Sequence, residues 1–161
     1  MKRIALLALA LLLFASSALA DAYVFGSFEL AVPEDVQVEE HENTCTVVRG
    51  QTRVVVQVIP QELSEDGQAQ VRELMTVYSE AITDVSDVSL ISELFGAMGL
   101  IENRLDAGIH EVPVLILSDG ELLILSGYDL DGDTLAVHTL LTELLSGATL
   151  AGEAILPTTT K

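Results

Sequence analysis

Three aspartates on alternate positions, Asp129, Asp131 and Asp133, have the residue type and spacing that come nearest to a metal site. An EF-hand loop binds calcium through oxygen ligands at positions 1, 3 and 5, with a glycine at position 6 and a glutamate at position 12. Counted from Asp129, however, glycine stands at position 4 and Leu140 at position 12. Calcium binding is therefore one hypothesis. The simpler one is that Gly132 turns the chain and Asp133 caps a following helix.

The three histidines, His41, His110 and His138, could in principle join carboxylates around a transition metal. Two histidine ligands on one helix face need a spacing such as H-x-x-x-H or H-E-x-x-H, which the sequence lacks. Such isolated histidines are typical of surface or boundary positions. The sequence therefore predicts no zinc site.

Signatures of nucleophilic or acid–base catalysis are also missing. No G-x-S-x-G elbow is present, and no motif links Cys45 to a histidine. Acidic pairs such as Glu39 with Glu40, or Asp119 with Glu121, could imitate a glycosidase dyad. Among 25 acidic residues such pairs arise by chance, and the chain has no tryptophan to form a sugar platform. An enzyme, such as a small secreted hydrolase, stays the less favoured alternative.

The single cysteine, Cys45, rules out an intramolecular disulfide. It alternates with Val47 in a β-branched segment, which predicts a small buried hydrophobe. The alternative is a reactive or intermolecular thiol, but this needs basic neighbours that the sequence scarcely offers.

The N-terminus has the pattern of a secretory signal peptide over residues 1–20. Lys2 and Arg3 precede an apolar run, and Ala18 and Ala20 form the A-x-A arrangement that signal peptidase accepts. The competing interpretation is a retained membrane anchor, because the run approaches the length of about 20 residues that spans a bilayer. The small-residue end favours cleavage. We therefore expect a secreted or periplasmic protein that begins at Asp21 and has no transmembrane segment after cleavage.

The charge is strongly negative. Loss of Lys2 and Arg3 with the leader would take the formal charge from −18 to −20. Nucleic acid and anionic membrane surfaces would repel such a chain, so neither is expected as a partner. The charge itself indicates solubility, with diffuse cation binding or adaptation to salt as alternatives.

Hydrophobic periodicity predicts the elements of the first two thirds of the chain. Alternation indicates a strand over residues 23–33, followed by an acidic stretch and then a hairpin around Gly50. Helical spacing indicates an amphipathic helix within 64–84 and a second helix over 87–98. The segment 101–112 is ambiguous between a short strand and a connection.

The last third gives the clearest local pattern. Two apolar arms flank Asp119 and Gly120, which predicts a hairpin whose arms are covered on both faces. A final helix over 133–146 is expected to turn five apolar residues inward: Val137, Leu140, Leu141, Leu144 and Leu145. Together the elements predict one α+β domain over 21–148 with a tail over 149–161. Its fold class would be an α/β/α sandwich, a mainly antiparallel sheet with helices on both faces.

Two segments carry a family resemblance: "FGSFELAVPEDVQV" near the start and the closing "DTLAVHTLLTELLSG". With the two hairpins between them, this layout resembles the PsbP-like family, which includes the photosystem II extrinsic protein PsbP and the bacterial DcrB-like proteins. The resemblance implies an α/β/α sandwich with a binding or assembly role. Val36 stands where the family usually has an aromatic residue after "VPED", and no functional residue carries over.

These observations favour a non-enzymatic binding or assembly protein of the cell envelope or the extracellular space. Its partner would be a protein or an envelope component, engaged through a sheet edge, a loop or an exposed face. A calcium or other cation-binding protein is the second hypothesis, with Asp129, Asp131 and Asp133 as candidate ligands, and otherwise no cofactor is expected. The oligomeric state does not follow from the sequence.

Overall fold

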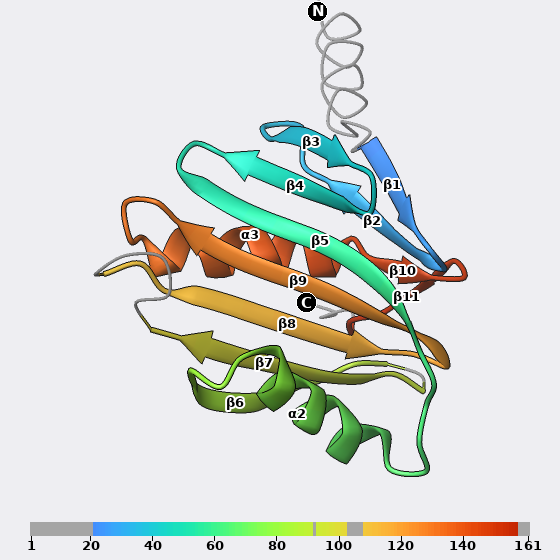
Figure 1. Ribbon diagram of the computed structural model, residues 1–161. Helices are drawn as coiled ribbons and strands as arrows, with labels where there is room; N and C mark the ends of the chain where they lie inside the picture. Colours follow the sequence, from blue (N-terminus) through green and yellow to red (C-terminus); the bar gives the residue numbers. More distant parts are fainter. Residues whose placement is uncertain (1–20, 92, 103–107, 158–161) are drawn as a thin grey trace, which may run out of the picture.

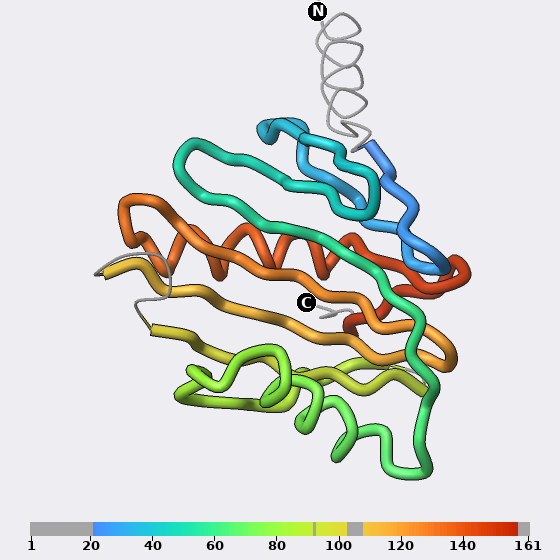
Figure 2. Tube along the Cα trace, viewed as in Figure 1, coloured from blue at the N-terminus to red at the C-terminus, as the bar shows by residue number. Residues whose placement is uncertain are grey.

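The computed structural model describes residues 21–91, 93–102 and 108–157. Of these residues, 50% lie in strands and 19% in helices. The described residues form two sheets and two helices. Figure 1 shows how these elements are arranged, and Figure 2 traces the same path of the chain. The elements in chain order are β1 (Asp21–Phe25), β2 (Phe28–Val32), β3 (Gln37–His41), β4 (Thr44–Arg49), β5 (Thr52–Gln61), α2 (Gly67–Tyr78), β6 (Ile82–Val88), β7 (Phe95–Ile101), β8 (Glu111–Leu117), β9 (Gly120–Asp129), α3 (Thr134–Ser146), β10 (Thr149–Leu150) and β11 (Glu153–Ala154).

The larger sheet has seven strands in the order β3-β4-β5-β9-β8-β7-β6, and every neighbouring pair is antiparallel. Its centre is the long pairing of β5 with β9, which runs from Thr52 opposite Asp129 to Gln61 opposite Gly120. The smaller sheet has the order β1-β2-β10-β11. Strands from both ends of the chain therefore meet in each sheet.

The hairpin β8–β9 lies inside the larger sheet and is buried on both faces, as its sequence predicts. On β8, Val114 and Ile116 belong to one apolar cluster, while Leu115 and Leu117 belong to the other. Successive side chains of a strand point to opposite faces, so each cluster lies on its own side of the sheet. The positive φ of Gly120 fits the tight turn expected there.

Helix α3 and the smaller sheet cover one face of the larger sheet. The five apolar residues expected to face inward from α3 are all buried, which confirms this helix. Phe28, Leu30 and Val32 of β2 belong to the same cluster. The helix approaches β9 closely at Gly127, where a Cβ atom would lie 2.7 Å from Val137 Cγ1. Glycine is therefore required for this packing.

Helix α2 lies on the opposite face, against β6, β7 and β8 (Figure 1). Val71 and Met75 pack there with Ala97 and Leu115. Asp66 caps the helix by accepting the N–H of Ala69 at 3.0 Å. The predicted amphipathic helix is confirmed, although it ends at Tyr78.

The expected α/β/α sandwich is wrong, because the protein is mostly antiparallel β-sheet. One helix lies on each face, but neither forms a helical layer. On the α3 side the smaller sheet covers part of the face, and on the other side α2 covers only three of the seven strands. The error arises because strand pairings far apart in sequence were not visible in local patterns.

The predicted helix over 87–98 is also wrong. This segment contributes to β6 and β7, which pair with each other, and β7 pairs with β8. Apolar residues such as Leu90, Leu94 and Met98 have helical spacing by coincidence. Burial between two neighbouring strands decides the conformation of β7, since strand preference depends on tertiary context.

The first predicted strand, residues 23–33, is in fact the hairpin β1–β2. Gly26 has a φ of 57° and turns the chain where an unbroken strand was expected. The acidic stretch that follows was expected to be a connection, but it contains a further strand, β3. These two differences create the cleft described below.

The remaining expectations have mixed outcomes. The hairpin around Gly50 is confirmed as β4–β5. Within 101–112, Glu111 and Val112 begin β8, while 103–107 lie outside the described residues. In the predicted tail, residues 149–154 form β10 and β11, and Ile155 is fully buried. The predicted leader, residues 1–20, lies outside the described part, and so does the end of the chain from 158.

We predict that Gly127→Ala destabilises the protein by about 1–3 kcal/mol, because the added methyl group would overpack the contact between β9 and α3. Urea unfolding measures the change. Gly50→Asn is the matched control: nothing lies within 4 Å of a Cβ there, and asparagine tolerates the left-handed conformation. It should cost less than about 1 kcal/mol. Equal losses in the two variants would contradict the close approach of α3.

Candidate functional site

The structure gives Asp129 a structural role at the end of β9. Its side chain is 5% exposed. Oδ1 accepts the backbone N–H groups of Asp131 at 2.8 Å and Asp133 at 3.1 Å, and Oδ2 accepts the Thr52 hydroxyl at 2.7 Å. Burial by itself raises the pKa of Asp129, but these hydrogen bonds, with the charge of Arg53, hold the pKa below its usual range. Both carboxylate oxygens are thus engaged by the fold.

The other two aspartates of this segment differ in their surroundings. Asp133 caps α3 by accepting the N–H of Ala136 at 3.1 Å, as the simpler interpretation of the sequence expects. Asp131 is exposed. Within 21–91, 93–102 and 108–157, no three His, Cys, Asp or Glu residues gather as metal ligands. Calcium binding by this segment stays a prediction.

The histidines lie on separate elements. His41 ends β3, His110 precedes β8, and His138 lies in α3. Across the described chain, no hydrogen bond joins a histidine side chain to a serine, to Cys45 or to a carboxylate, and buried Nδ1 of His110 has no partner. The hydrolase alternative therefore gains no catalytic pair from the described residues.

One polar cluster was not predicted from the sequence. Glu111 is only 5% exposed, and its Oε1 accepts the Ser126 hydroxyl at 2.6 Å and the Tyr78 hydroxyl at 2.8 Å. Tyr78 ends α2, so the cluster ties this helix to the centre of the larger sheet. A buried carboxylate needs such donors. No sequence pattern links these three residues.

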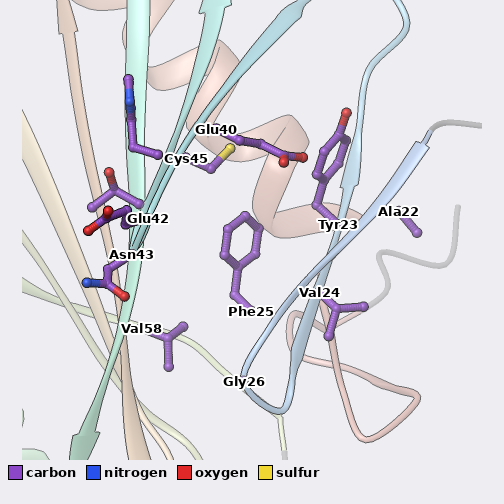
Figure 3. Close-up of a pocket in the computed structure, with 12 residues that line it drawn as sticks. Ala22, Tyr23, Val24, Phe25, Gly26, Glu40, Glu42, Asn43, Cys45 and Val58 are labelled. Carbon is purple, nitrogen blue, oxygen red and sulfur yellow. The ribbon is translucent and has the colours of Figure 1, made fainter.

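A cleft of about 560 Å³ lies between the hairpins β1–β2 and β3–β4. Figure 3 shows Tyr23 and Phe25 pointing from β1 into the space between the two hairpins, where Cys45 lies on the opposite side. Val58 of β5 adds a further apolar side chain. We call this the edge cleft. Its lining combines these apolar side chains with polar ones from the turn between β3 and β4.

Two free sheet edges frame the edge cleft. Among the described strands, β1 pairs only with β2, and β3 pairs only with β4. A second cavity of about 350 Å³ lies beside it, lined by Tyr23 of β1, Val38 of β3 and the loop between β2 and β3. Tyr23 lines both cavities, so the hollow region follows the two free edges.

Two contacts fix the hairpins on either side of the cleft. The turn of β1–β2 is held by Glu121, whose Oε2 accepts the N–H of Ser27 at 2.8 Å. The loop before β3 is held by Arg49, which donates to Asp35 at 2.7 Å and to Glu143 of α3 at 2.6 Å. The pKa of Arg49 is raised, chiefly by the hydrogen bond to Glu143. The cleft therefore lies between two anchored walls.

The rim of the edge cleft is acidic. Glu40 and Glu42 line it, and Figure 3 shows the Glu40 carboxylate reaching toward Tyr23. Asp21 and Glu34 line the neighbouring cavity. No lysine or arginine among the described residues lines either cavity. The site thus combines a few apolar side chains with a negative rim that no described lysine or arginine in the lining compensates.

Cys45 is 2% exposed, which confirms the predicted small buried hydrophobe. Burial, with the nearby charge of Glu40, raises the pKa of the Cys45 thiol to about 11. The thiolate is the nucleophilic form of cysteine, so at neutral pH this side chain is inert. It serves the cleft as an apolar group.

The sequence does contain one pattern that indicates a strand at this site. Val36 and Val38 alternate with polar residues in "VQVEEHEN", which is the period of a half-buried strand. With Gly26 as a turn, the pattern would give two hairpins in place of one strand and a loop. The pattern does not show, however, that the two hairpins lie close to each other in the folded protein.

Comparison with known proteins gives a fold and no family. No family model matches the chain, and no curated protein matches it. The resemblance to PsbP-like proteins is therefore not confirmed. A solved structure from Bacteroides thetaiotaomicron VPI-5482 is similar with a TM-score of 0.53 and 12% identity, over 82% of this chain and 48% of the other. This chain spans about half the length of that protein, and the likeness concerns the fold alone.

A second solved structure, LpqN, involved in cell envelope biogenesis of Mycobacterium tuberculosis, is more remote. It is similar over 88% of each chain, with a TM-score of 0.44 and 13% identity. At this level the likeness carries no argument. A further finding concerns membranes: none of the helices in the described part of the chain has the length and apolar character needed to cross a bilayer.

We predict that Asp129→Ala lowers the free energy of unfolding by about 2 kcal/mol at pH 7, because buried donors lose a charged acceptor. The pKa of Asp129 is depressed in the folded state. Its contribution is therefore present above the unfolded pKa of about 3.9 and is lost as the pH falls through the folded pKa. Denaturation at several pH values should show a deficit that shrinks below pH 4.

Asp131→Ala is the control for this measurement. It removes an exposed carboxylate two residues away and should change the stability by less than about 0.5 kcal/mol. If the two variants behaved alike, the structural role of Asp129 would be refuted.

We also predict that Cys45 in the folded protein reacts with iodoacetamide at pH 8 at least about a hundredfold more slowly than in urea-unfolded protein. A pKa of about 11 leaves little thiolate, and burial limits access. Mass spectrometry of timed samples measures both rates. Comparable rates in the two states would show that the thiol is exposed and ionised.

Proposed function

We propose that this protein is an exported binding or assembly protein that acts in the cell envelope or the extracellular space and holds its partner in the edge cleft. The proposal of export rests on the leader pattern of residues 1–20. The proposal of binding rests on the site itself, since a concave surface that brings apolar side chains and convergent polar groups together is typical of binding sites.

One observation carries the assignment: a cleft of about 560 Å³ lies between two sheet edges that are free among the described strands. Natural proteins usually cover or blunt such edges, because unpaired N–H and C=O groups invite pairing with another chain. Among the described strands, β1 and β3 each leave one edge free, and Tyr23 and Phe25 line the space between them. A surface of this kind is suited to a partner.

A binding role agrees with the chemistry of the cleft. Its thiol, Sγ of Cys45, is protonated and buried. His41 lines the cleft without a hydrogen bond to Cys45 or to Glu40. Such groups can contact a ligand, but they do not make an activated nucleophile.

Site-specific photocrosslinking tests the proposal. With p-benzoylphenylalanine in place of Tyr23, irradiation of intact host cells should give one dominant adduct, because this side chain points into the edge cleft. The matched control places the same group at Tyr128, a tyrosine of similar half-buried exposure on β9. This strand directs Tyr128 to the face opposite the cleft, since its neighbour Gly127 faces α3.

The expected result is an adduct at Tyr23 that is absent at Tyr128, with both proteins showing the thermal unfolding of the unmodified chain. Equal labelling at both positions, or labelling at Tyr128 alone, would place the binding surface elsewhere. Mass spectrometry then identifies the partner.

A further inference from the structure

The edge cleft offers a backbone as well as a pocket. β3 is five residues long and has one neighbour, β4, among the described strands. Its opposite edge therefore presents backbone groups along about 17 Å, at roughly 3.4 Å for each residue. An extended peptide can satisfy such groups by adding a strand to the sheet. The free edge thus fits a partner segment in extended conformation.

The charged side chains around this edge determine which net charge a bound segment would carry. Glu40 and Glu42 lie in the cleft, Glu39 is exposed on β3, and Asp21 starts the facing strand β1. The described arginines 49 and 72 are paired elsewhere, with Glu143 and Asp35 for the first and Asp87 for the second. An acidic segment, including β3 of a second copy, would meet like charges, whereas a basic segment would meet opposite ones.

The two faces of β3 also differ. Val38 lies opposite Val47, and Glu40 opposite Cys45, so both point toward the apolar cluster. Glu39 is on the outer face. A strand added beside β3 would direct alternate side chains toward the apolar wall of Tyr23 and the outer carboxylate. A pattern that alternates apolar and basic residues satisfies both faces.

We propose that the ligand of the edge cleft is an extended polypeptide segment with alternating apolar and basic residues, which pairs as an additional strand with the free edge of β3. This inference rests on the proposed function, because it names the class of partner for the same cleft. The apolar side chains enter the cleft, and the basic ones lie on the outer face against Glu39. The acidic edge at the same time disfavours pairing between copies of the protein.

Isothermal titration calorimetry with defined peptides tests the proposal. The probe is a nine-residue peptide of alternating valine and lysine, and the comparison peptide has glutamate in place of lysine. The purified protein should bind the basic peptide at least about tenfold more tightly, and this binding should weaken as salt is raised from 50 to 500 mM. Absence of binding by the basic peptide, or equal binding of both peptides, would overturn the proposal.

N-methylation of the basic peptide tests strand pairing separately from charge. In a strand, alternate N–H groups point to the same edge, so methylating only the valines blocks one edge and methylating only the lysines blocks the other. At least one of these two peptides should bind about tenfold more weakly than the parent, since it cannot donate to β3. If both bound as tightly as the parent, the segment would not be held as a strand.

Matched variants locate the binding. Glu39→Gln should weaken the binding of the basic peptide by about threefold, as expected for an exposed charge pair on the outer face of β3. Glu73→Gln, on the exposed side of α2, removes the same charge far from the cleft and should leave the affinity unchanged. Equal effects of the two variants would show diffuse attraction and would overturn the proposal.

Different results would refute the proposed function and the proposed strand addition. If a partner crosslinks at Tyr23 but no basic peptide binds, the cleft is a binding site for another class of ligand, and only the inference about strand addition fails. If crosslinking at Tyr23 yields no partner, the proposed function fails, whatever the peptides do.

Discussion

The ladder between β5 and β9 is the interaction on which the rest of the structure depends. It joins a hairpin from the first half of the chain, β4–β5, to a hairpin from the second half, β8–β9, over ten residue pairs. Each strand on its own would leave apolar side chains in water on one or both faces. Once joined, they form a sheet whose two faces both need cover. α3 and the smaller sheet bury one face, and α2 buries part of the other.

This arrangement leaves the sheet unfinished at one side. Among the described strands, β3 is the edge strand of the larger sheet beyond β5 and β4, and β1 is an edge strand of the smaller sheet nearby. The two edges do not pair with each other, although Glu121 and Arg49 hold the hairpins that carry them. The contacts that stabilise the fold therefore also keep the cleft open. Because the hairpins are held in place, the free edge presents its backbone groups to a partner without a conformational change of the protein.

Charge is distributed to the same effect. The described arginines 49 and 72 are engaged in ion pairs, and the edge cleft retains its glutamates without a lysine or arginine lining it. Exposed ion pairs add little to stability, so these charges matter more for which partners approach. The aspartates near the end of β9 have a different role from the glutamates of the cleft. The carboxylates of Asp129 and Asp133 accept hydrogen bonds from backbone N–H groups. Acidity therefore has two roles in this chain, one in folding and one at the surface.

The sequence by itself determined the elements in which local pattern and burial agree. These are α3 with its cap Asp133, α2 in outline, the hairpins β4–β5 and β8–β9, and the burial of Cys45. Tertiary structure decided the rest. In segment 87–98, β7 formed in place of a helix because β8 lies beside it. The cleft arose because two hairpins distant from the sheet centre lie side by side. Periodicity reports which face of an element is buried, but it does not report which partner buries it.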